Sequence, residues 1–183
     1  MTSLALQPQW LKRYYALRAA FSLAWVAAAF GLALSNPTLA SVLLVLYPAW
    51  DAVANFIDAR RSGGLARNKA QAINVAVSTA AALAVLVALA AGLSAVLGVY
   101  GAWAIAAGLL QLRTALLRRR QVGAQWAMIL SGAQSALAGT FFLLQSIKSG
   151  ATSIAPIAGY AAMGAIYFLL SALWLTLRRR RTA

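Results

Sequence analysis

The sequence has no cysteine, no histidine and only two acidic residues, Asp51 and Asp58. It therefore lacks disulfides, thiolate and imidazole metal ligands, a cysteine nucleophile and the usual general base. Two acids alone could hold a divalent cation or act as a carboxylate pair, but no other part of the sequence supports such a site. We therefore expect a protein that is not an enzyme and that has no cofactor and no metal.

Positive charge, by contrast, is abundant. The chain carries 16 lysines and arginines and a formal net charge of +14, which on a soluble protein would suggest a nucleic-acid partner. However, 63% of the residues are hydrophobic and only 10% are charged, with a mean hydropathy of +0.77. This balance lies well outside that of a soluble domain. The expected partner is the lipid bilayer and not nucleic acid.

Six apolar segments are long enough to cross a bilayer, which takes roughly 20 residues at a rise of about 1.5 Å each. Short turns such as 35–38 separate some of them, and basic connections such as 60–69 separate the others. Short turns force neighbouring spans into antiparallel hairpins. The pattern predicts an all-α protein in which residues 1–183 form a single membrane domain. The spans are expected at about 14–34, 38–58, 70–91, 94–116, 124–146 and 152–177.

The positive residues lie almost entirely on one side of these spans. Fifteen of the sixteen flank the basic connections and the chain ends, and Lys148 alone lies on the other side. The positive-inside rule then predicts a multi-pass protein of the bacterial inner membrane with both termini in the cytoplasm. We expect the first span to remain uncleaved, because its apolar region is long for a signal peptide. The basic rim would face anionic lipid headgroups.

The three predicted hairpins resemble one another. Their approximate ranges are 12–60, 68–118 and 124–178. Similar strings occupy their second spans: Tyr47-Pro48-Ala49-Trp50-Asp51, Tyr100-Gly101-Ala102-Trp103-Ala104 and Tyr160-Ala161-Ala162-Met163-Gly164. Ser22 and Ser135 lie the same distance before the tyrosines of the first and third strings. The pattern predicts three parallel repeats about an axis along the membrane normal, with the three tyrosines around it.

These features resemble a known family. The tandem hydrophobic hairpins, the Asn36-Pro37 turn, the preceding Gly31 and the length of 183 residues are similar to the HdeD-like family of small bacterial membrane proteins. The resemblance implies a non-enzymatic integral protein, acting in acid resistance, in envelope stress or as a membrane scaffold. That family has no established catalytic residues, so the resemblance assigns none here.

The second span carries the polar residues whose placement inside a membrane costs the most free energy. Asp51, Asn55 and Asp58 fall at i, i+4 and i+7 and therefore share one helix face. Counted from the short turn, Arg18 lies about 24 Å deep, between Asp51 at about 20 Å and Asp58 at about 30 Å. Arg18 is therefore the expected partner of one of the two acids. We favour a structural ion pair, because a single acid within the membrane makes a poor relay.

The alternative is a small transporter or channel that uses Asp51, Asn55 and Gln134, the last in the fifth span. A continuous polar cavity reaching Asp51 would favour transport, whereas a fully packed interior would favour a stress-related or scaffolding protein.

Small residues in the fifth span and a proline in the second are expected to shape the packing and course of these helices. The fifth span carries small residues at every fourth position, Ser131, Ser135 and Gly139, which allows close helix packing. We expect this ladder to pack inside the bundle, with a homo-oligomer as the alternative. Pro48 is expected to bend the second span just before Asp51 and to free a carbonyl for a polar partner.

Overall fold

The computed structural model describes residues 8–120, 125–148 and 153–180. Throughout this part of the chain the regular structure is helical, with no strand. The elements are α1 (Pro8–Ala28), the π-helical turn η1 (Ala29–Ala33), α2 (Pro37–Arg61), α3 (Lys69–Ala88), the 3-10 turn η2 (Leu89–Ala91), α4 (Leu93–Arg118), α5 (Gln125–Lys148) and α6 (Ala155–Arg180).

Six helical segments are long and apolar enough to cross a membrane: Gln9–Ala33, Pro37–Arg61, Lys69–Ala91, Leu93–Arg118, Gln125–Lys148 and Ala155–Leu177. This confirms the predicted all-α fold with six spans and makes the chain a multi-pass membrane protein. The first span begins several residues before its predicted start at 14, since α1 already begins at Pro8. The predicted starts of the fifth span at 124 and of the sixth at 152 lie outside the described residues.

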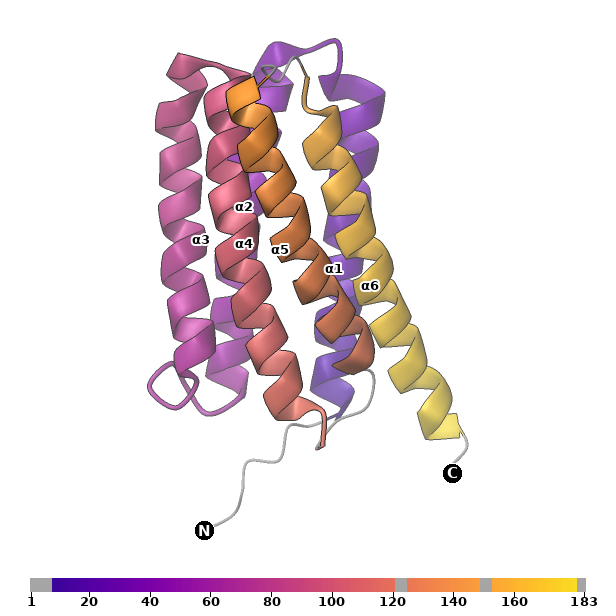
Figure 1. Ribbon diagram of the computed structural model, residues 1–183. Helices are drawn as coiled ribbons and strands as arrows, with labels where there is room; N and C mark the ends of the chain where they lie inside the picture. Colours follow the sequence, from indigo (N-terminus) through magenta and orange to yellow (C-terminus); the bar gives the residue numbers. More distant parts are fainter. Residues whose placement is uncertain (1–7, 121–124, 149–152, 181–183) are drawn as a thin grey trace.

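The helices stand side by side in one bundle, and neighbours in the sequence run antiparallel (Figure 1). α1 begins and α6 ends at the same end of the bundle, where the 62–68 connection also lies. We call this the basic end. The opposite end, with the short connection at 34–36 and Gly92, is the turn end. Which end faces the cytoplasm stays a prediction.

Packing joins the helices into a ring in chain order, closed by α1 against α6. The most extensive interfaces are α4 with α5, α1 with α6 and α2 with α3, whereas α1 and α2 contact each other little. Each extensive interface therefore links the second helix of one predicted hairpin to the first helix of another. The hairpins fit the chain's antiparallel course, but they are not the units of tightest packing.

Glycine makes the α4–α5 interface especially close. A Cβ atom on Gly139 would lie 2.5 Å from the Gly101 carbonyl oxygen, and one on Gly108 would lie 2.7 Å from that of Gly132. Ser135 adds a hydrogen bond from its hydroxyl to the Ala104 carbonyl at 3.0 Å. The predicted small-residue ladder of α5 therefore packs within the chain, as expected.

Pro48 lies inside α2 and has no N–H to donate to the carbonyl one turn earlier. That carbonyl, on Leu44, instead accepts a hydrogen bond of 2.6 Å from the Tyr100 hydroxyl on α4. The adjacent Leu43 carbonyl accepts one of 2.8 Å from the Trp25 indole. The predicted use of a freed carbonyl by a polar group is confirmed, and it ties α2 to α1 and α4.

The two halves of the bundle interior differ in polarity. The turn half is an apolar cluster, which includes Leu43, Leu44, Val85, Val96, Leu97, Phe142, Ile154 and Ile157. The basic half has a smaller apolar cluster around Leu11, Met128 and Phe168. It also contains most of the buried polar side chains, among them Asp58, Gln71 and Arg118. Among the described residues, buried polar side chains are therefore concentrated from the middle of the bundle toward the basic end.

Candidate functional site

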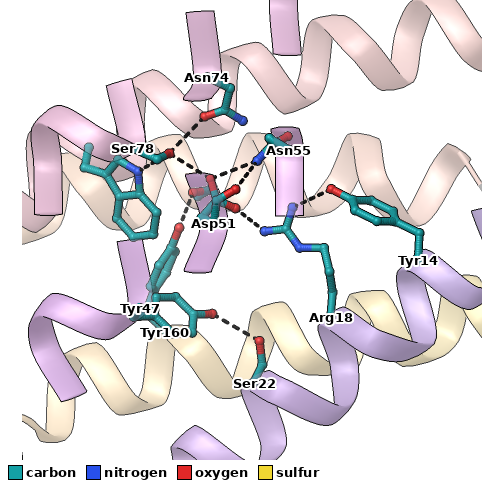
Figure 2. Close-up of polar contacts among 11 residues, drawn as sticks. Tyr14, Arg18, Ser22, Tyr47, Asp51, Asn55, Asn74, Ser78 and Tyr160 are labelled. Carbon is teal, nitrogen blue, oxygen red and sulfur yellow. Dashed lines mark hydrogen bonds and ion pairs between the residues drawn. The ribbon is translucent and has the colours of Figure 1, made fainter. Parts of the chain in front are cut away.

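Asp51 is the centre of the inner polar cluster, and its residue is only 6% exposed. Arg18 of α1 reaches across to its Oδ1 atom in an ion pair. On the other side, Asn55 donates to Oδ2 at 3.0 Å and Ser78 of α3 donates to it at 2.8 Å. Figure 2 shows these side chains converging on Asp51 from three helices. Both carboxylate oxygens therefore have partners.

Arg18 is itself held from several directions. Its Nη1 donates to the Tyr14 hydroxyl at 2.9 Å, one turn earlier on α1. Its guanidinium lies 4.3 Å from the ring centroid of Phe168 on α6. Cation–π contact of this kind is strongest where water is excluded. The arginine is thus fixed by an acid, a hydroxyl and an aromatic face.

Asp58 forms a second cluster closer to the basic end and is only 2% exposed. Arg118, at the end of α4, donates to its Oδ2 atom at 2.9 Å. The Gln71 amide donates to the same oxygen at 3.3 Å, and the Trp10 indole donates to Oδ1 at 3.2 Å. The two acids of α2 are therefore each paired with an arginine from a different helix.

An aromatic cluster lies on the turn side of Asp51. The Trp103 ring centroid is 6.0 Å from that of Tyr47, 5.5 Å from Tyr100 and 6.5 Å from Tyr160, each in an edge-on arrangement. The predicted gathering of three tyrosines is present, with Trp103 between them. The Trp103 indole also donates to Ser78 at 3.0 Å, which connects this cluster to Asp51.

The shared serine–tyrosine spacing has a structural counterpart. The hydroxyls of Ser22 and Tyr47 lie 3.4 Å apart, and those of Ser135 and Tyr160 lie 2.7 Å apart. Both pairs join the first and second helices of a predicted hairpin. The two contacts are alike, and the repeat of the hairpins stays a prediction.

Three cavities, each lined in part by polar side chains, follow one another toward the basic end. The Asp51 cavity, of about 50 Å³, is lined by Arg18, by Asp51 and by Tyr47, Trp103 and Tyr160 of the aromatic cluster. The Asp58 cavity, also of about 50 Å³, shares with it Arg18, Asn74, Gln111 and Phe168. The basic-end cavity, of about 390 Å³, shares with the Asp58 cavity Ala70, Gln71, Thr114 and Arg118. Volumes of this size hold water in a polar setting.

The predicted site residues line the two inner cavities. Asp51 and Gln134 line the Asp51 cavity, Asn55 and Asp58 line the Asp58 cavity, and Arg18 lines both. Gln134 accepts a hydrogen bond of 2.6 Å from the Tyr167 hydroxyl and does not contact Asp51 directly. Of the two pairings expected for Arg18, the one with Asp51 is present, and Asp58 pairs elsewhere.

Sequence reasoning missed Arg118 and Trp10 as members of the site. Both lie close to the basic end of their helices, where the sequence indicates for Arg118 only a charge that sets the orientation of the spans. Asp58 is buried and needs a charged partner, but its place in the sequence, close to the basic end of its span, does not reveal this burial, and the basic connections contain many arginines. Nothing in the sequence singles out Arg118 among them.

Side chains of these types can interact with small charged species. Carboxylates, guanidiniums and amides can hold ions, water and protons through charge-assisted hydrogen bonds. Within the described residues, no group of three or more metal-ligating side chains occurs. The site thus consists of two acid–arginine pairs along cavities that share lining residues.

No family model, no curated protein and no solved structure matches this chain. The resemblance to the HdeD-like family accordingly stays a prediction.

Proposed function

We propose that this protein is a non-enzymatic membrane transport protein, which admits a proton or a small inorganic ion from the basic end to the Asp51–Arg18 pair. The observation that carries the proposal is the run of three cavities with shared walls, ending at Asp51. The proposal further places the protein in the bacterial inner membrane, with the basic end in the cytoplasm.

The shape of the interior supports a site that is accessible from one side. Beyond Asp51 the aromatic cluster and the apolar turn half fill the bundle. Transporters commonly bind their substrate near the middle of the membrane and open to one side at a time. The bundle would correspond to the form open at the basic end, with the region around Trp103 as the part that must move.

The size and charge of the inner cavities define the species. About 50 Å³ in each of the two inner cavities leaves room for water and small ions but not for larger solutes. Two acid–arginine pairs follow each other along this route. A proton can neutralise the carboxylate of a pair. An anion can take the place of that carboxylate beside the arginine. Either species can therefore break an ion pair.

The test is flux through the purified protein in liposomes, measured as proton movement with an enclosed pH dye and as chloride movement with an electrode. Asp51→Asn is expected to reduce the flux to the level of empty liposomes. Thr140→Val is the matched control, because Thr140 is exposed on α5 and lines none of the three cavities.

A second variant guards against a folding defect. Gly164 lines the Asp51 cavity, and Gly164→Leu would fill this space without removing a charge. It is expected to block flux while the protein keeps its elution volume and helical circular dichroism. Unchanged flux in both Asp51→Asn and Gly164→Leu would overturn the transport proposal.

A second candidate is the stress-related or scaffolding role. It is favoured by one observation: both oxygens of Asp51 already have partners, as in a structural ion pair. This role predicts no flux above empty liposomes for the unaltered protein, together with reduced acid survival of cells that lack it.

A further inference from the structure

The basic-end cavity is much larger than the two inner cavities, at about 390 Å³. It lies between the connection that follows α2, the beginning of α3 and the end of α4. This size is within the range of sites that hold small molecules. It is therefore large enough for a ligand that the inner cavities exclude.

Four cations line this cavity: Arg67, Lys69, Arg113 and Arg118. Arg118 is buried and pairs with Asp58. The other three are exposed, and the chain has only two acidic residues, both already held in the ion pairs with Arg18 and Arg118. No acidic side chain remains to neutralise the three, so their field acts on the cavity and selects an anion.

Backbone donors add to the charge. α3 begins at Lys69, and its first-turn residues Lys69, Ala70 and Gln71 line the cavity. Asn68 precedes them but gives no side-chain cap. Its amide donates instead to the carbonyls of Ser62 and Gly64, at 2.8 and 2.9 Å. The first N–H groups of α3 are thus left for a ligand, at the positive end of the helix dipole.

We propose that the basic-end cavity binds a phosphate group, carried either by soluble phosphate or by the headgroup of an anionic phospholipid. Two guanidiniums, an ammonium group and uncapped helix N–H donors form the set of groups that proteins use for this tetrahedral anion. The exposed Leu117 in the cavity wall offers an apolar contact that a lipid would use and free phosphate would not.

Phosphate binding at this cavity does not require transport through the inner cavities. The two proposals can therefore fail separately, because binding is measured at equilibrium and transport as flux. The chain also offers a matched comparison. Arg60 and Arg120 are exposed cations near the same end, yet they line none of the three cavities. Lys69→Gln with Arg113→Gln and Arg60→Gln with Arg120→Gln remove the same charge, but only the first pair alters the cavity.

Two probes separate the two sources of phosphate. In an uncharged maltoside detergent, equilibrium dialysis measures binding of radiolabelled inorganic phosphate to the full chain. In mixed micelles, native mass spectrometry compares the retention of phosphatidylglycerol with that of phosphatidylcholine. Thermal unfolding of each variant without ligand checks that the fold is kept.

The cavity variant is expected to weaken binding by about tenfold or more, because it removes two charge-assisted contacts, while the comparison variant keeps the affinity of the unaltered protein. Binding of inorganic phosphate assigns the site to a soluble anion, and selective retention of phosphatidylglycerol assigns it to lipid. Equal weakening by both variants would mean that only overall surface charge acts, and it would overturn the proposal. So would the absence of binding to either probe by the unaltered protein.

Discussion

At the scale of single residues, the stability of this bundle depends on buried carboxylates that need a positively charged partner. Asp51 and Asp58 are almost fully buried, and each has an arginine and further donors around it. Removing one partner of a buried pair leaves the other charge without compensation, whereas removing both charges together is much less damaging. This asymmetry makes the Asp51–Arg18 pair testable.

Arg18→Met is expected to destabilise the protein by about 3–5 kcal/mol, because it leaves the Asp51 carboxylate buried beside neutral donors. The double variant Arg18→Met with Asp51→Asn is expected to recover a large part of that loss. Unfolding in a series of denaturing detergent mixtures measures both. If the double variant is less stable than Arg18→Met, the pair is not the main link between α1 and α2.

The Tyr100 hydroxyl is expected to stabilise α2 next to Pro48. Tyr100→Phe removes the 2.6 Å hydrogen bond to the Leu44 carbonyl and leaves that carbonyl buried without a donor. The expected loss is about 1–2 kcal/mol of unfolding free energy, measured in the same way. The same change at Tyr167, which is only partly buried, is expected to have a smaller effect.

At the scale of helices, the close approach of α4 and α5 depends on glycine. Gly139→Ala would bring a Cβ atom to 2.5 Å from the Gly101 carbonyl oxygen, a distance that forces the helices apart. The expected result is a loss of about 1–3 kcal/mol, as for other overpacked sites. This loss of stability is measured as a lower midpoint temperature of thermal unfolding.

Gly159→Ala in α6 is the control for this change. A Cβ atom there would meet nothing within 4 Å, so the substitution is expected to be neutral or to stabilise the helix by up to about 1 kcal/mol. Equal effects at Gly159 and Gly139 would show that helix propensity, and not the α4–α5 contact, determines the outcome.

At the scale of the whole molecule, the polar half and the apolar half of the bundle are expected to differ in their access to water. Because the chain has no cysteine, single cysteines report on this access without interference. Gln111 lines both inner cavities, whereas Leu97 is buried in the apolar cluster.

A charged, membrane-impermeant thiol reagent is therefore expected to modify Gln111→Cys faster than Leu97→Cys. Adding the reagent to one side of sealed vesicles also tests the predicted orientation, because only reagent on the cytoplasmic side is expected to reach Gln111→Cys. Equal, slow modification at both positions would indicate that the cavities do not connect to the basic end.

Much of this molecule followed from local sequence. Span length and hydropathy determined the six helices, because a spanning helix satisfies its own backbone and needs only a sufficient apolar run. Helix periodicity likewise determined that Asp51, Asn55 and Asp58 share a face, and counting along two spans brought Arg18 to the level of Asp51. The carbonyl freed by Pro48 was also a local consequence of the chain.

Tertiary structure alone decided which helices pack most closely and which arginine forms an ion pair with Asp58. α2 packs on α3, and α6 closes the ring on α1, although the sequence suggested separate hairpins. Arg118 could be distinguished from its basic neighbours only by the rotation and tilt of α4 against α2. The cavities arise in the same way, from side chains of several helices that meet in space. Such contacts depend on helix packing, which a linear pattern of polar and apolar residues does not specify.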